Sequence, residues 1–260
     1  MYSQLFEIEL PEFLRTILNS NHITIYSYPL CIIIGSFFSI YFLRKKEKEH
    51  NHYFFTIQLL LIIIAAAFLG GKLFLFFERP LYFINNPKHI VEIISGGYVF
   101  YGSFIACILS LILYLRIKKK PILKSLDIIA LSTLILHAFG RIGCFLAGCC
   151  YGKPSQLGII FPKSYPNKVH PTQLYEVTLL LIIFIILHKI YRKKTHDGDI
   201  FIRYIFYYAI GRIIIEYFRG DNRGYIINNT FSHSQAIGVI VIFFTILFYF
   251  KLKAKNKETL

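Results

Sequence analysis

Residues 57–71, IQLLLIIIAAAFLGG, and residues 178–191, TLLLIIFIILHKIY, decide the class of fold. Each is a nearly unbroken apolar run, and about 20 apolar residues are enough to span the hydrocarbon core of a bilayer. We expect seven membrane-spanning helices in all, at residues 25–43, 54–77, 98–117, 122–139, 174–190, 200–218 and 235–250. The sequence therefore predicts an all-α, polytopic helical membrane protein, with residues 1–260 forming a single integral-membrane domain.

The composition excludes several other classes of protein. The chain of 260 residues is 55% hydrophobic and only 17% charged, which rules out a disordered or collagen-like protein. Its net charge of +15 would suit nucleic acid if the cations formed one folded face. They lie instead in short clusters between the apolar runs, as in RKKEKEH (44–50) and YRKK (191–194). We therefore expect membrane lipids, and no nucleic acid, as partners.

The distribution of these clusters predicts the topology. Seven spans leave alternate loops on opposite sides, and the Lys and Arg residues outside the spans divide 18 to 9 between the two sides. Cytoplasmic loops carry the excess of positive charge, so we expect an external N-terminus and a cytoplasmic C-terminus. The segment before about residue 22 has no basic cluster, and we expect a short interfacial helix there in place of a cleavable signal peptide.

Arg141, in HAFGRIGCFLAGCCYGKP (137–154), is the first candidate for a functional side chain. An arginine at membrane depth costs a few kcal/mol to insert and is kept mainly where it faces a cavity or binds a ligand. Because four glycines surround it, we expect irregular backbone here, as part of a loop over residues 140–173. The alternative is a side chain that only snorkels to the interface.

Arg212, in YYAIGRIIIEYFRG (207–220), is the second candidate. Tyr208, Arg212, Glu216 and Arg219 recur at spacings of four, four and three, which predicts one face of a helix. One carboxylate between two guanidinium groups leaves a net positive charge, and phosphate is a natural partner for a planar bidentate donor. The alternative is a purely structural ion pair between Arg212 and Glu216.

Two further motifs carry polar side chains. HPTQLYE (170–176) opens a span, with Pro171 early in the helix and Thr172 as a possible cap. His170 and Glu176 there suit acid and base chemistry, or else only anchor the loop at the interface. SGGYVFYGS (95–103) places tyrosines before another span, where an aromatic belt is the alternative to a site.

Three cysteines, Cys144, Cys149 and Cys150, are grouped in the long loop. Their C-x4-C-C spacing matches no standard zinc pattern, so we expect no metal. A disulfide from Cys144 to Cys149 or Cys150 is an alternative if the loop is external.

Taken in order, six motifs resemble the bacterial phosphatidylglycerol to prolipoprotein diacylglyceryl transferases over nearly the whole chain. They are IYSYPLCIIIG (25–35), GGKLFLFFERPLYFINNP (70–87), SGGYVFYGSFIA (95–106), GRIGCFLAGCCYGKP (140–154), HPTQLYE (170–176) and GRIIIEYFRG (211–220). Six matches in the right order and at similar spacing are far more specific than any single one.

The resemblance implies a reaction. In this family a diacylglyceryl group moves from phosphatidylglycerol to the lipobox cysteine thiol of a lipoprotein precursor, which forms a thioether and releases glycerol phosphate. We expect a monomeric enzyme of the bacterial inner membrane that needs no metal or soluble cofactor, because fixed charge alone activates the leaving group. The positions that fall on the family's functional residues are Tyr28, Arg141, Gly152, Tyr208, Arg212, Glu216 and Arg219. Fixed arginines in a water-excluded cavity suit the charge that builds up on a departing phosphate.

The chain departs from the family pattern at two positions. Tyr101 stands where the motif usually places a histidine proposed as the base, and Cys144 stands where the signature usually has asparagine. A neutral tyrosine, with an ordinary pKa of about 10, is a poor base at neutral pH. Three routes to a thiolate stay open: Tyr101 as a phenolate beside Arg141; another acceptor, namely His137, His170 or Glu176; or acidification by the arginines alone.

Two other functions stay open as well. A divergent paralogue would keep the lipid site and transfer to another acceptor, or transfer nothing. A small-molecule transporter would also have buried charges in its spans, although the internal repeats that favour one are absent from the sequence.

Overall fold

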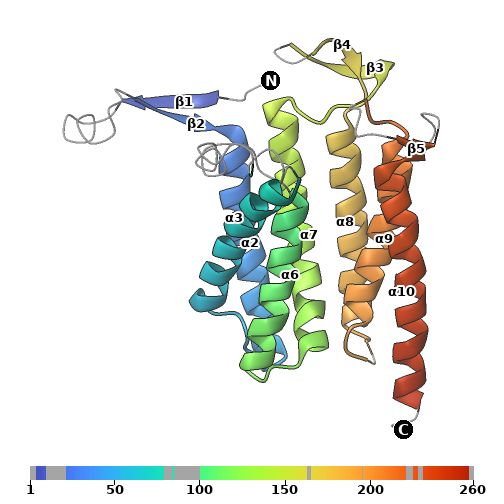
Figure 1. The fold of residues 1–260 in the computed structure, drawn as a ribbon. Coiled ribbons are helices and arrows are strands. Elements are labelled where there is room, and N and C mark those ends of the chain that lie inside the picture. The colour runs from blue at the N-terminus through green and yellow to red at the C-terminus, as the bar shows by residue number, and fades with distance from the viewer. Residues whose placement is uncertain are drawn as a thin grey trace. The chain divides into compact units, whose positions relative to one another are not determined.

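The computed structural model describes residues 4–9, 22–78, 84, 100–162, 165–194, 196–220, 225–227 and 231–257 (Figure 1). Most of these residues are helical. The helices are α2 (Ser27–Glu49), α3 (Ile57–Glu78), α6 (Phe100–Ile117), α7 (Ile122–Ala147), α8 (Thr172–Tyr191), α9 (Asp199–Glu216) and α10 (His233–Lys257).

The prediction of a polytopic helical membrane protein is confirmed. Among the described residues, five helices are long and apolar enough to cross a membrane: α2, α3, α7, α8 and α10. The apolar part of α6, Gly102–Ile117, is shorter. α9 differs because it carries four charged residues, Asp199, Arg203, Arg212 and Glu216, within its 18 residues.

The chain divides into two compact units, residues 47–125 and residues 1–46 with 126–260. The first unit holds α3 and α6, which pack through small residues. A side chain at Gly102 would strike the backbone oxygen of Gly70, so the two helices approach closely because neither position has a Cβ. Ser103 Oγ also donates a hydrogen bond of 2.7 Å to the carbonyl oxygen of Ala67. That residues 1–260 form a single integral-membrane domain stays a prediction.

The second unit contains α7, α8, α9, α10 and most of α2. Ser39 Oγ on α2 donates a buried hydrogen bond of 2.8 Å to the carbonyl oxygen of Ser132 on α7. A Cβ at Gly143 on α7 would lie 3.1 Å from Tyr28 Cδ2 and 3.2 Å from Cys31 Cβ. The glycines of this unit therefore allow helix contacts, and α2 packs against the second half of α7.

α7 is longer than the sequence predicted, and the expectation of irregular backbone around Arg141 is wrong. The helix runs through Gly140 and Gly143 to Ala147, because both glycines serve packing and break no hydrogen-bonded turn. It ends at Gly148, whose φ of 74° is the left-handed conformation that commonly closes a helix. The loop between α7 and α8 thus begins at Gly148, and Arg141 lies on a helix.

Three antiparallel strand pairs were not predicted: β1 (Gln4–Glu9) with β2 (His22–Tyr26), β3 (Pro154–Phe161) with β4 (Tyr165–Val169), and β5 (Tyr225–Ile227) with β6 (Phe231–Ser232). The first pair corrects the expected interfacial helix in the part of the N-terminal segment that the structure describes; residues 10–21 lie outside it. The physical reason is the apolar and polar alternation in FEIE and the β-branched residues in HITIY. β3 and β4 lie at the end of the second unit where α8 begins (Figure 1).

Candidate functional site

Glu176 is the centre of a buried polar cluster in the second unit. It lies in the second turn of α8 and is only 1% exposed. Its Oε1 accepts a hydrogen bond of 2.7 Å from the Tyr208 hydroxyl on α9 and lies 2.9 Å from Arg141 Nη2 on α7. His137 Nε2, one turn before Arg141, is 3.4 Å from the same oxygen. Three helices therefore meet at one carboxylate oxygen.

A second carboxylate holds the arginines of the α9 motif. Arg212 Nη2 lies 2.6 Å from Glu216 Oε2, and Arg219 Nε lies 3.8 Å from the same oxygen. Glu216 Oε1 accepts a hydrogen bond of 3.2 Å from Ser232 Oγ, just before α10. The expectation that Arg219 shares the helix face is wrong, because α9 ends at Glu216 and Arg219 follows a two-residue turn.

Arg219 is instead part of a backbone bridge to Gly152. Gly152 N donates a 2.8 Å hydrogen bond to the carbonyl oxygen of His170, and a Cβ there would strike the carbonyl oxygen of Phe218. Only glycine fits where these three backbone segments cross. The crossing joins the segment after α7, the start of α8 and the end of α9.

The two carboxylates do not neutralise the cluster. Three guanidinium groups, those of Arg141, Arg212 and Arg219, face Glu176 and Glu216, which leaves a charge of +1 when His137 is neutral. Arg141 Nε and Arg212 Nη1 are buried and have no hydrogen-bond partner among the described residues. Buried donors are normally paired, so these two N–H groups suit an anionic ligand.

The other predicted site residues lie at different distances from this cluster. His137 is close, since its ring centroid is 5.2 Å from that of Tyr208. Tyr28, which is 44% exposed, contacts α7 at Gly143. His170 is otherwise engaged: its Nδ1 is 3.0 Å from the Tyr175 hydroxyl. This contact fits the loop-anchoring interpretation of His170.

Tyr101 belongs to α6 in the other unit, and its side chain lies outside the described residues, as do residues 79–83, 85–99 and 221–224. Much of SGGYVFYGS and part of the 70–87 motif fall in these gaps. The proposed contact between Tyr101 and Arg141 therefore stays a prediction.

Thr172 and Gln173 hold the backbone of the loop after α7, a role that the sequence did not reveal. The N-cap residue of α8 is Pro171, which directly precedes Thr172, and no side chain makes a capping hydrogen bond, so the cap assigned to Thr172 is wrong. Thr172 Oγ1 donates a 2.8 Å hydrogen bond to the carbonyl oxygen of Cys150, and Gln173 Nε2 donates one of 2.5 Å to that of Cys149. In the sequence, the only indication of this role is that two residues with hydrogen-bonding side chains stand directly before the apolar run of α8.

The three loop cysteines are free thiols. The structure therefore does not contain the alternative disulfide from Cys144 to Cys149 or Cys150. Cys144 is on α7, while Cys149 and Cys150 follow the helix. Hydrogen bonds from Cys144 and Cys149, with the positive charges of Arg219 and Arg141, hold the pKa of the Cys150 thiol below its ordinary value.

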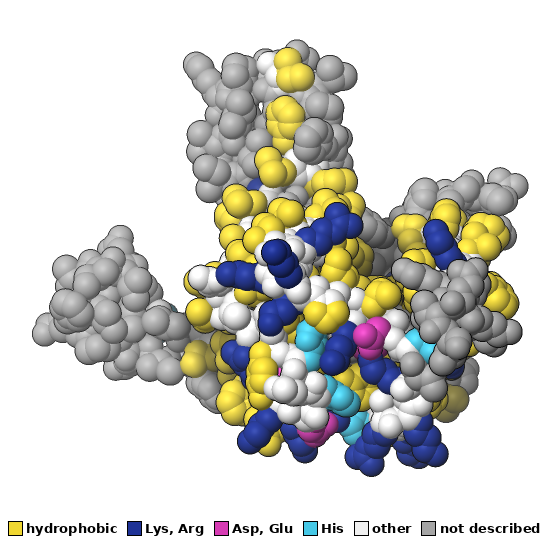
Figure 2. All heavy atoms as spheres, turned by 90° about the horizontal axis from the view of Figure 1, so that it is seen from below, with side chains coloured by type: hydrophobic (Ala, Val, Ile, Leu, Met, Phe, Trp, Pro, Cys, Tyr) yellow, Lys and Arg dark blue, Asp and Glu magenta, His cyan; other side chains and the backbone are white. Residues whose placement is uncertain are grey.

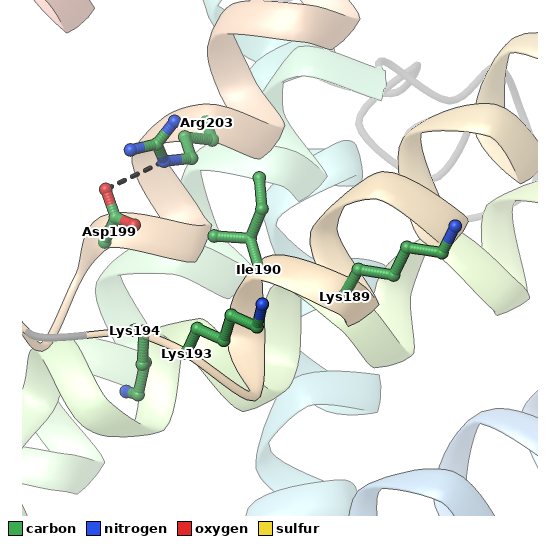
Figure 3. Close-up of a pocket in the computed structure, with 6 residues that line it drawn as sticks. All are labelled: Lys189, Ile190, Lys193, Lys194, Asp199 and Arg203. Atoms are coloured by element: carbon green, nitrogen blue, oxygen red, sulfur yellow. Dashed lines mark hydrogen bonds and ion pairs between the residues drawn. The ribbon is translucent and has the colours of Figure 1, made fainter.

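A separate cavity of about 350 Å³ lies where α8 ends and α9 begins. Its lining is basic, with Lys189, Lys193, Lys194 and Arg203 beside Ile190 and Asp199 (Figure 3). Arg203 Nε is paired with Asp199 Oδ1 at 2.9 Å, and Lys194 Nζ with the buried Asp127 Oδ2 at 2.8 Å. Lys and Arg side chains gather on the face seen from below in Figure 2. Such a face is typical of a cytoplasmic membrane surface.

The fold and the cluster define a class: a polytopic helical membrane protein that buries a net positive, arginine-rich site among its helices. Sequence comparison gives the family. Residues 15–251 match the family described as prolipoprotein diacylglyceryl transferase, and the chain belongs to this family. The resemblance carried by the six motifs is confirmed.

Individual relatives agree. The chain is 38% identical to the phosphatidylglycerol–prolipoprotein diacylglyceryl transferase of Clostridium tetani (strain Massachusetts / E88), over 73% of this chain and 77% of the relative. It is 32% identical to the second such protein of Clostridium perfringens (strain 13 / Type A), over 73% and 76% of the two chains. The corresponding protein of Clostridium novyi (strain NT) is also 32% identical, over 68% and 72%.

Proposed function

We propose that this chain transfers a diacylglyceryl group from phosphatidylglycerol to the lipobox cysteine thiol in the signal peptide of a prolipoprotein. Family membership supports the reaction class, and the buried cluster around Glu176 and Glu216 supports the lipid substrate. The observation that carries the proposal is a pair of buried arginine N–H groups, Arg141 Nε and Arg212 Nη1, that have no hydrogen-bond partner among the described residues.

Arg141 and Arg212 hold the lipid phosphate in this proposal. Their other nitrogens are fixed by Glu176 and Glu216, so each guanidinium is oriented before the lipid arrives. Such preorganised donors stabilise a transition state without reorganising as the charge develops. Glu216 positions Arg212 and Arg219, and Gly152 keeps Arg219 in place through the backbone bridge.

The reaction changes the charge on the phosphate. The thiol sulfur forms a bond to the glyceryl carbon, and the bond from that carbon to the phosphate oxygen breaks with its electron pair left on oxygen. A phosphodiester monoanion thereby becomes a phosphate monoester that carries a second negative charge until it takes up a proton. The excess positive charge of the cluster stabilises this second negative charge. The proton that the thiol loses equals the proton that the phosphate monoester takes up, so the reaction is balanced.

The acceptor of the thiol proton is a separate question. Arg141 and Tyr208 both bind Glu176 through Oε1, and these contacts stabilise the charged form of the carboxylate, which opposes its protonation. The Nδ1 atom of His170 is already engaged by the Tyr175 hydroxyl at 3.0 Å. Among His137, His170 and Glu176, His137 is best placed: its ring lies beside Tyr208 and one turn from Arg141, and its Nε2 is 3.4 Å from Glu176 Oε1, a possible acceptor for the proton that the ring takes up.

We also propose the membrane arrangement. The basic cavity between α8 and α9 supports a cytoplasmic location for that end, which agrees with the external N-terminus and cytoplasmic C-terminus of the charge bias. The protein then works as a monomer in the bacterial inner membrane. Its arginine cluster lies toward the opposite end of α8, near the outer leaflet.

The test is transfer in vitro with purified protein, phosphatidylglycerol vesicles and a lipobox peptide, read as the mass of the peptide. We expect a diacylglyceryl mass shift with the native chain and a loss of at least about 100-fold with Arg141→Ala. Lys168→Ala, an exposed cation in β4, is the matched control and should keep native turnover. Intact lipid and unmodified peptide with folded native protein would refute the proposal.

A further inference from the structure

Three thiols converge beside the arginine cluster. Cys144 is in the last turns of α7, and Cys149 and Cys150 follow Gly148. The three Sγ atoms all lie within 4.8 Å of one another. Neither the reaction nor the lipid-binding residues described above use them.

The backbone that carries these thiols is fixed from two sides. Cys149 N donates a 3.1 Å hydrogen bond to the carbonyl oxygen of Cys144, which ties the loop to the end of α7. On the other side, Thr172 and Gln173 of α8 hold the carbonyl oxygens of Cys150 and Cys149. Both of these side chains are only 1% exposed. The thiols are therefore carried by a loop whose backbone is held by hydrogen bonds from both α7 and α8, which favours a site over a chance encounter of side chains.

Cys150 also has an unusual backbone. Its φ is 63°, in the left-handed region that a residue with a Cβ rarely adopts. In an extended segment, the side chains of two adjacent residues point to opposite faces. The left-handed backbone of Cys150 departs from this arrangement, and the sulfur atoms of Cys149 and Cys150 both lie close to that of Cys144.

The spacing of the sulfur atoms fits a bound metal ion. A zinc–sulfur bond is about 2.3 Å long, so the sulfur atoms of a tetrahedral site lie about 3.8 Å apart. Three thiols within 4.8 Å of one another need to close by only about 1 Å, which rotation of their side chains supplies. A disulfide requires two of them to approach to about 2.05 Å and leaves the third thiol without a role.

The location suits a second route to the acceptor thiolate, one that needs no proton acceptor among the side chains. Cys144 is one helical turn after Arg141 on α7, and the charges of Arg219 and Arg141 act on Cys150. Three thiolates and one Zn²⁺ carry a net charge of −1, which these guanidinium groups offset. A site with three protein ligands also leaves a fourth position open, as catalytic zinc sites do.

We propose that Cys144, Cys149 and Cys150 bind Zn²⁺ and that the open fourth position takes the acceptor thiol of the lipobox peptide. This replaces the expectation of a metal-free site. A metal-bound thiol is deprotonated at neutral pH, so the ion supplies the thiolate without a histidine in the position of Tyr101. The second half of the proposal rests on the proposed function; the metal site itself does not.

The step balances without any change of oxidation state. The acceptor thiol binds zinc through sulfur and releases its proton to water. The sulfur then forms its bond to the glyceryl carbon while the bond from carbon to the phosphate oxygen breaks. The electron pair leaves with the phosphate, which takes a proton from water, and the thioether, a weaker ligand than a thiolate, leaves the metal.

The experiment measures metal binding apart from transfer. The full chain is purified in detergent, stripped with a chelator and titrated with Zn²⁺, and with Co²⁺ as a spectroscopic probe for thiolate-to-metal charge transfer. We expect one ion per chain and affinity at least about 10-fold weaker in Cys144→Ser, Cys149→Ser and Cys150→Ser. Cys107→Ser, a cysteine of α6 outside the cluster, is the matched control and should bind as the native chain does.

The acceptor half is tested on the native cobalt protein, with no substitution that affects folding. A lipobox peptide should shift the charge-transfer band, and the same peptide with serine in place of cysteine should leave it unchanged.

A native chain that binds no metal, or that contains a disulfide within the cluster, overturns the metal site. Full transfer by metal-free protein overturns the acceptor role and leaves the proposed function intact, whereas metal binding without transfer refutes the proposed function and leaves the metal site intact.

Discussion

Arg141 Nη2 on α7 and Glu176 Oε1 on α8 form a buried ion pair at 2.9 Å, with Glu176 only 1% exposed. The two residues are far apart in the sequence, and their pairing joins the signature motif to HPTQLYE. Removing one member of a buried pair leaves the other charge in a medium that solvates it poorly. The pair is therefore a requirement for both the folded state and the orientation of Arg141.

Glu176→Gln tests this requirement. Because glutamine keeps a hydrogen bond to Tyr208 but loses the charge, we expect a destabilisation of about 3 kcal/mol and loss of most transfer activity. Thermal unfolding in detergent and turnover by peptide mass measure the two effects. Tyr208→Phe is the control that removes only the hydrogen bond, and it should cost about 1 kcal/mol. Equal costs for the two variants would contradict a charge-based role for Glu176.

Arg212→Lys tests whether the planar guanidinium matters. Lysine keeps the positive charge and an ion pair with Glu216 but loses the fork that binds phosphate at two points. We expect kcat to fall by about 100-fold with lysine, and by more with alanine.

The control for Arg212 is Arg203→Ala on the same helix. Arg203 also pairs with an acidic residue four positions away, Asp199, but at the basic end of α9. Its loss should leave turnover unchanged. A similar fall for both arginines would mean that α9 needs its ion pairs only for stability.

The helices were predictable from the sequence because a membrane span is a local property of length and hydropathy. The error lay at the end of α7, where Gly140 and Gly143 suggested a break. Their role as contact positions depends on α2, which the local sequence does not contain. The short strand pairs were missed for a related reason, since their pairing partners stabilise them more than their own sequence does.

The site was predictable only where it follows helix periodicity. Arg212 and Glu216 are four residues apart, so their contact can be read from the spacing. The contact of Arg141 with Glu176 depends on how α7 packs against α8, and no spacing indicates it. The C-x4-C-C pattern likewise gave no zinc signature, because the convergence of its sulfur atoms depends on the Gly148 turn and on hydrogen bonds from α8.

Lys194 is expected to stabilise the folded protein less as the pH becomes alkaline. Burial lowers its pKa, but the hydrogen bonds and charges of Asp127 and Asp197 outweigh this and raise the pKa above the ordinary value. The contribution of such a group is fully present below the unfolded pKa of about 10.4 and is lost as pH rises through the higher folded value. Thermal unfolding should show Lys194→Gln to be less stable than native at pH 8, and the difference should shrink at alkaline pH.

The control for Lys194 is Lys193→Gln, which removes an exposed charge from the next position. It should change stability by less than about 0.5 kcal/mol at either pH. If Lys194→Gln were less stable than the native chain by the same amount at both pH values, the loss would come from packing of the side chain and not from its charge.

Gly152→Ala should be among the most damaging small substitutions in the chain. The new methyl group would strike the carbonyl oxygen of Phe218 and lie 2.7 Å from His170 Cβ, so the bridge to Arg219 has to open. We expect lower thermal stability and, because Arg219 then loses its place beside Glu216, a loss of turnover larger than the loss of folded protein. Gly140→Ala is the matched control: its nearest neighbour is Ile32 Cδ1 at 3.5 Å, an ordinary contact, and alanine favours the helix by about 0.5 to 1 kcal/mol. Native turnover in Gly152→Ala would show that the bridge is dispensable and that the position of Arg219 is set by its ion pair with Glu216 alone.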